Sequence, residues 1–181
     1  MLRSPSESVT LVAASARDVD AVHALYTACT QALLDRGIRQ WDSAYPNRAV
    51  AEDAARRGDL YRLVAPGGDT VGSVILNDVA APEYAPIVWQ TATPALVIHT
   101  LVVDPRRQGG GLGRAAMACC EAFARARGFA SIRLDAYPGN PAAIALYERL
   151  GYALRGEVVF GFKPAGHQHY AVYEKALGPA Q

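Results

Sequence analysis

Residues 94–116, PALVIHTLVVDPRRQGGGLGRAA, constrain the fold more than any other stretch of the chain. The first half is a nearly uninterrupted run of aliphatic and β-branched residues, which predicts a strand buried on both faces. Pro105 ends that strand, and glycines follow at 109, 110, 111 and 113. Glycine lets the backbone come close to a ligand and turn several N–H groups toward it. With the positive end of the helix predicted after the loop, these amides indicate an anion site suited to a pyrophosphate.

The other elements follow from hydrophobic periodicity and from start and stop signals. Strands are expected over 9–13, 60–65, 70–76, 96–103, 131–136, 153–160 and 168–176. Helices are expected from Asp18 as N-cap to Gly37, from Asn47 as N-cap to Arg57, from Leu112 to Ala126, and from Asn140 as N-cap to Gly151. On the third helix, Cys119 is expected to face the sheet and Cys120 to flank the buried stripe. This order, part hairpin and part crossover, predicts an α/β fold with a mixed sheet.

Two kinds of protein use a glycine-rich loop between a strand and a helix. Gly111-x-Gly113-x-x-Ala116 fits a dinucleotide fingerprint, and Asp135 lies about 20 residues further on, where a ribose-binding acid would lie. Against this, residues 104–108 separate the strand from the glycines, and too little chain follows for the remaining strands of a dinucleotide fold. An oxidoreductase using a nicotinamide cofactor is therefore kept as an alternative.

Two motifs favour a different family. Gln108-x-x-Gly111-x-Gly113, after a strand that ends Leu-Val-Val-Asp-Pro, resembles the acyl-CoA loop of the GCN5-related N-acetyltransferase (GNAT) superfamily. Residues 140–152, NPAAIALYERLGY, are similar to its second signature, the short helix after the fifth strand. The resemblance covers residues 9–177. It implies one acetyltransferase domain with a mixed sheet of about seven strands and about four helices, in which the fourth and fifth strands splay apart.

The resemblance also assigns the cofactor site. Acetyl-CoA would pair with main-chain atoms of Leu101 and Val103, and Asn140 would bond the pantetheine arm. The expected loop contacts are Gln108, Gly109, Gly110, Gly111, Leu112, Gly113 and Arg114. Arg106 and Arg107 also flank the loop and are further candidates for phosphate contacts.

Tyr147 matches the tyrosine of the second motif and would protonate the leaving thiolate, because its phenol is reasonably matched to a thiol. The alternative is a core aromatic with a satisfied hydroxyl. His99, on the central strand, is the candidate general base and could equally be a structural histidine. Asp135, Glu83, Tyr84, His167 and His169 are weaker alternatives, and some members of the superfamily need no dedicated base.

The acceptor site is expected to include Trp41 and Tyr45, in the aromatic link between the first two helices, although Trp41 could simply fill the core. Tyr84 lies in the long proline-containing link 77–94, which is also expected near the acceptor, and Asp135 is a further candidate contact. The aromatic loops suggest a small, partly apolar primary amine as substrate.

Composition excludes several other classes. The chain has 181 residues and a net charge of +1, with no basic tract to suggest nucleic acid. Residues 1–8 and 178–181 are expected to be tails around one domain, and no apolar run approaches a membrane span. Three cysteines without a disulfide or zinc pattern favour the cytoplasm, and no metal ligation is expected. The resemblance allows a homodimer, and a non-catalytic acyl-CoA sensor remains a second alternative function.

Overall fold

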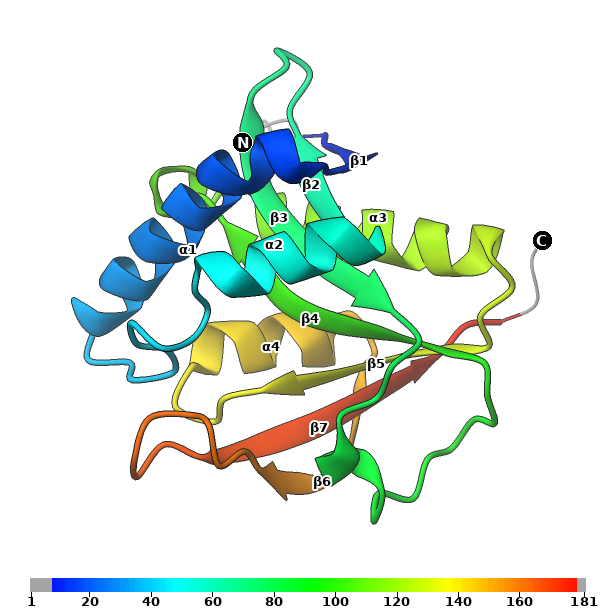
Figure 1. Ribbon diagram of the computed structural model, residues 1–181. Helices are drawn as coiled ribbons and strands as arrows, with labels where there is room; N and C mark the ends of the chain where they lie inside the picture. Colours follow the sequence, from blue (N-terminus) through cyan, green and yellow to red (C-terminus); the bar gives the residue numbers. More distant parts are fainter. Residues whose placement is uncertain (1–7, 179–181) are drawn as a thin grey trace, which may run out of the picture.

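The computed structural model describes residues 8–178 and contains a seven-stranded mixed sheet (Figure 1). The strands are β1 (Thr10–Ala13), β2 (Leu60–Val64), β3 (Thr70–Asn77), β4 (Ala95–Val103), β5 (Ser131–Ala136), β6 (Ala153–Val159) and β7 (His169–Ala176). Their order is β1-β2-β3-β4-β5-β7-β6, and β4 and β5 are the parallel pair. The α/β prediction with about seven strands is confirmed. The predicted tails at 1–8 and 178–181 lie outside the described residues, except for Ser8 and Gly178.

Four helices cover the two faces of the sheet, as predicted. They are α1 (Val19–Leu34), α2 (Arg48–Arg57), α3 (Leu112–Ala126) and α4 (Pro141–Arg149). α1 and α2 lie on one face, and α3 and α4 lie on the other (Figure 1). The alternation along β3 serves both layers, because Ile75 packs in the α1–α2 cluster while Val74 and Leu76 pack in the α3–α4 cluster.

A side-chain cap fixes the start of α2. The Oδ1 atom of Asn47 accepts from the N–H of Val50 at 3.2 Å, and Gly58 ends α2 in the left-handed region at φ 79°. Asp18 stands at the predicted N-cap position of α1, but its side chain does not cap that helix. Its carboxylate instead accepts from the N–H of Ser15 at 2.8 Å, closing a capping box around a 3₁₀ turn at Ala16–Asp18.

The buried face of α3 differs by one residue from the prediction. Cys120 is fully buried against the sheet together with Met117 and Ala124. Cys119 is half-buried, and its thiol donates to the carbonyl of Val9 at 3.2 Å. The helix therefore presents the Met117–Cys120–Ala124 stripe, and the expected roles of the two cysteines are reversed. All three cysteines are free.

A buried ion network anchors the long link between β3 and β4. Glu174 on β7 is 1% exposed and accepts from the N–H groups of Gln90 at 2.7 Å and Thr91 at 3.3 Å. Arg133 and Arg155 lie 3.5 and 3.3 Å from its carboxylate oxygens. The Arg133 guanidinium also donates to the carbonyl of Thr91 at 2.8 Å. The link is therefore held on the sheet although it contains only one short 3₁₀ turn, Pro82–Tyr84.

None of the helices in the described range 8–178 is long and apolar enough to cross a membrane. Over the same residues, no group of three or more His, Cys, Asp or Glu side chains is placed to hold a metal ion.

Candidate active site

The site begins where β4 leaves β5. The two strands pair only from Ala95 opposite Ser131 to Ile98 opposite Leu134, although β4 continues to Val103. On its other side β4 stays paired with β3, with a register shift between Ser73 and Ile75. Thr100 lies in this shift with φ 45°, so β4 carries one extra residue, which is a β-bulge. The predicted splay of the fourth and fifth strands is confirmed.

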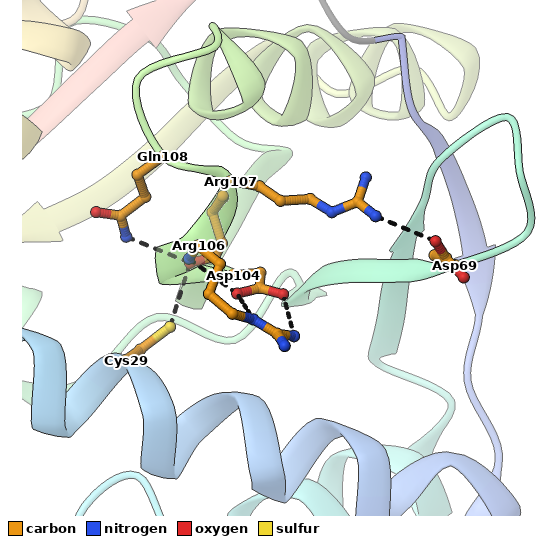
Figure 2. A network of polar contacts seen from close by, with 7 residues as sticks. Cys29, Asp69, Asp104, Arg106, Arg107 and Gln108 are labelled. Carbon is orange, nitrogen blue, oxygen red and sulfur yellow. Dashed lines mark hydrogen bonds and ion pairs between the residues drawn. The ribbon is translucent and has the colours of Figure 1, made fainter.

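The splay leaves the β5-facing edge of β4 without a partner strand around Leu101 and Val103, the two residues expected to bind through main-chain atoms. The carbonyl of Val103 accepts from the Cys29 thiol and from the Gln108 side-chain amide, each at 3.3 Å (Figure 2). The side chains of Leu101 and Val103 are half-buried and pack against the core. An extended ligand arm could therefore pair with this edge as an added strand would.

The glycine-rich loop leads into α3, whose first backbone N–H groups have no side-chain cap. Gly111 is the N-cap residue with φ 89°, and no side chain caps the helix. The first helical bond runs from the N–H of Ala115 to the carbonyl of Gly111 at 3.0 Å, so the N–H groups of the preceding residues have no partner within the helix. α4 is different, because the Oδ1 atom of Asn140 accepts from Ala143 at 3.3 Å. The uncapped terminus of α3 is thus suited to a phosphate.

Glycine is required at two further positions of the loop, for different physical reasons. Gly109 has φ 93°, a conformation that a β-carbon would strain. A β-carbon on Gly113 would meet the Cδ2 atom of Leu146 at 3.2 Å, so Gly113 allows α3 to lie close to α4. Gly111 is open where its β-carbon would point, with no atom within 4 Å.

Most of the arginines near the loop are engaged with carboxylates. Arg106 donates to Asp104 at 2.7 Å, and Arg107 donates to Asp69 at 3.1 Å (Figure 2). The Arg106 side chain holds the pKa of the Asp104 carboxyl below its usual range. Arg114, in the first turn of α3, forms no ion pair with any residue in 8–178 and is the arginine best placed for a phosphate.

A cavity of about 260 Å³ opens at the splay. Six segments surround it: the β4–β5 split, the α1–α2 link, residues 81–83, α4, the loop between β6 and β7, and β7. The structure brings seven residues singled out from the sequence to its wall, namely Trp41, Tyr45, Glu83, His99, Leu101, Asp135 and Tyr147. Trp41 is 7% exposed and packs in the α1–α2 cluster, so it lines the cavity and fills the core at once.

Tyr84 lies behind the wall. It is 2% exposed, and its hydroxyl donates to the carboxylate of Asp135 at 2.8 Å. Asn140 lies at the other side of the site, where its side-chain amide donates to Gln40 at 2.9 Å while capping α4. Tyr84 therefore holds Asp135, and Asn140 connects α4 to the α1–α2 link.

Burial governs the titration of the cavity wall. It raises the pKa of the Asp135 carboxyl and that of the Tyr147 phenol, and it lowers the pKa of His99. His99 Nε2 lies 3.0 Å from Oδ1 of Asn77. The Tyr45 hydroxyl lies 2.5 Å from the Thr100 hydroxyl, and burial raises the pKa of Tyr45 to about 12. At neutral pH the wall thus offers protonated phenols and a neutral imidazole.

Lys163 also lines the cavity, and sequence reasoning missed it. It lies in the loop between β6 and β7 and is 8% exposed. Burial lowers its pKa to about 8. The signal available in the sequence was its setting in Phe160-Gly-Phe162-Lys163-Pro164, where two phenylalanines precede the lysine.

Comparison with known proteins agrees with this geometry. A family model described as the acetyltransferase (GNAT) family matches residues 19–152. A mycothiol acetyltransferase from Streptosporangium roseum is 46% identical over 55 residues, which are 30% of this chain and 16% of that protein. A streptothricin acetyltransferase from Streptomyces lavendulae is 32% identical over 108 residues, covering 60% of this chain and 50% of that protein. These matches span half or less of either relative.

Solved structures agree on the fold. A GNAT-family acetyltransferase from Streptococcus agalactiae has a TM-score of 0.80 and 18% identity, with 93% of this chain and 95% of that chain covered. The sheet of this chain, in which β4 and β5 are the parallel pair, is not the doubly wound parallel sheet that the dinucleotide alternative requires.

Proposed function

Because this chain belongs to the acetyltransferase (GNAT) family, we propose that it transfers an acetyl group from acetyl-CoA to a primary amine of a small acceptor, by direct attack. One observation carries the proposal: the cavity opens at the point where β4 leaves β5. A ligand arm along the free edge of β4 and an amine in the cavity would meet there. Acetyl-CoA supplies the activated thioester, and the chain supplies position and proton transfer.

The residues present fit acetyl-CoA. The uncapped amides of α3, after Gly111, would hold the pyrophosphate, and Arg114 would add a charge-assisted contact. Main-chain groups of Leu101 and Val103 would hold the pantetheine arm, and Asn140 would bond its far end. A backbone N–H at the splay would stabilise the oxygen that becomes negative during transfer.

Proton transfer needs a donor near the leaving sulfur and an acceptor near the amine. The Tyr147 hydroxyl is protonated at neutral pH, which is the form that an acid requires, although burial raises its pKa and makes it a weaker acid than a free phenol. Two groups could accept the proton of the amine. His99 is neutral because burial lowers its pKa, and Asp135 gains basicity because burial raises its pKa. We assign the acid to Tyr147 and the base to His99, with Asp135 in contact with the amine.

Calorimetric titration with acetyl-CoA and with NADH, followed by an assay of CoA release with a panel of primary amines, tests the proposal. We expect acetyl-CoA to bind, NADH not to bind, and at least one small amine to cause CoA release. Binding of acetyl-CoA with no release for any amine would favour the sensor alternative. Binding of NADH alone would refute the proposed reaction. A homodimer joined through the C-terminal strands stays a prediction, to be tested by light scattering.

A further inference from the structure

Lys163 is held in an aromatic cage at the wall of the cavity. Its Nζ atom lies 4.1 Å from the ring centre of Tyr45, 4.8 Å from that of Tyr170 and 5.3 Å from that of Phe162. Its backbone N–H donates to the carbonyl of Phe160 at 3.1 Å, which fixes the loop on which the side chain is mounted. Three rings at these distances stabilise an ammonium through cation–π attraction.

The cage leaves the hydrogen-bond donors of this ammonium unused. Among residues 8–178, no carboxylate oxygen lies within 4 Å of Nζ. The Tyr170 hydroxyl donates to the carbonyl of Gln40 at 2.9 Å, and the Tyr45 hydroxyl is engaged with Thr100. Asp135, an acid on the cavity wall, already accepts from Tyr84. Asp135 and Asp42 favour the charge of Lys163 only from beyond 4 Å. A cation that is more than nine-tenths buried and has no anion in contact is costly unless a ligand supplies one.

We infer that the acceptor carries a carboxylate and that Lys163 binds it, so that the substrate class is the free amino acids and closely related amphoteric amines. This inference rests on the proposed acetyl transfer and specifies its acceptor. Both signs of charge are present around the cavity, because Asp135 and Glu83 line it together with Lys163. An acceptor with an ammonium and a carboxylate matches both, whereas a polyamine would place a second cation near Lys163.

The size and lining of the cavity agree with this class. About 260 Å³ is room for a small molecule, and the aromatic side chains of Trp41, Phe160 and Phe162 line part of it. A single charged anchor beside apolar walls would orient such an acceptor with its amine toward the splay between β4 and β5.

The test compares each of the twenty common L-amino acids with its carboxamide and with spermidine, in an assay of CoA release. We expect the best amino acid to exceed its carboxamide about tenfold to hundredfold in kcat/KM, the size expected for one hydrogen-bonded ion pair. Lys163→Met should remove this gap, and Lys163→Arg should keep part of it. Lys175→Met is the matched control, because Lys175 is the other lysine and pairs with Glu121 at 2.7 Å, away from the cavity.

A second measurement separates this inference from the proposed reaction. Calorimetry with N-acetylated L-amino acids and their carboxamides reports binding without turnover. If no amine is acetylated but the acids bind more tightly than the amides in a Lys163-dependent way, the reaction is wrong and the carboxylate site stands. Equal use of acids and amides, spermidine as the best acceptor, or a preference that survives Lys163→Met would each overturn the inference.

Discussion

Replacing Glu174 by glutamine should destabilise the protein strongly, although the shape of the side chain hardly changes. The carboxylate is fully buried, two backbone N–H groups of the β3–β4 link donate to it, and two guanidinium groups form ion pairs with it. The glutamine amide has one acceptor oxygen and turns an NH₂ group toward these donors. The Arg133 side chain, 8% exposed, then stays buried without a counter-charge.

The magnitude follows from that uncompensated charge. Removing one partner of a buried ion pair costs about 3–5 kcal/mol. For a chain of this length each kcal/mol lowers Tm by about 2–4 °C, so the loss is about 6–20 °C. The Arg133 guanidinium also lies 4.2 Å from the centre of the Trp89 ring, so loosening the ion network should free the link as a whole.

Differential scanning calorimetry measures the loss directly, and proteolysis of the native protein should show new cleavage within residues 85–94. Glu52→Gln is the control, because Glu52 pairs with Arg48 on the surface, where both side chains are at least half exposed, and it should leave Tm unchanged within error. A Tm for Glu174→Gln within 2 °C of the parent protein, a loss of about 1 kcal/mol or less, would refute the idea that this network anchors the link.

Three further outcomes are expected. Gly111→Val should abolish acetyl-CoA binding in calorimetry while the far-UV circular dichroism spectrum stays native. A β-branched residue is strained at φ 89°, and its side chain would occupy the open space beside the amides. Unchanged affinity would contradict the loop assignment. Tyr147→Phe should lower kcat far more than it changes KM, and equal activity would remove the acid role. Lys163→Met should stabilise the protein by about 3 kcal/mol at pH 7 and by much less at pH 10.5, as urea titrations would show. Burial lowers the pKa of Lys163 from 10.5 to about 8, so the unfolded chain holds the proton more tightly than the folded protein does. The cost of burying the charge is therefore lost as the pH rises from about 8 to 10.5. A stability difference that does not change with pH would contradict this reasoning.

Features that depend on neighbouring residues could be predicted from the sequence. The strand before Pro105, the glycine at the start of α3 and the Asn140 cap are all encoded within a few residues, and the structure has them. The prediction of the buried face of α3 was wrong, because two adjacent residues gave the same local signal. Cys119 and Cys120 are adjacent and both apolar, so the helical period alone could not decide which of them faces the sheet.

Features that depend on contacts between distant segments could not be predicted in this way. Lys163 enters the cavity because its loop crosses the end of the split in the sheet, more than 60 residues along the chain from Thr100. The engagement of Tyr84 with Asp135 joins residues 51 positions apart. Asp18 looked like a cap for α1, and only the conformation of Ser15 shows that it serves the turn before that helix.

Because of the bulge at Thr100, the geometry at the splay between β4 and β5 depends on the number of residues in β4 more than on which residues they are. The groups that would face the thioester are main-chain atoms, so exchanging the side chains of Leu101 or Val103 would test packing and little else. Deleting the extra residue at the bulge would instead restore regular pairing between β3 and β4 and change the direction of the main-chain groups at this point. In a survey of variants, this part of the site would therefore tolerate many substitutions and almost no change in length.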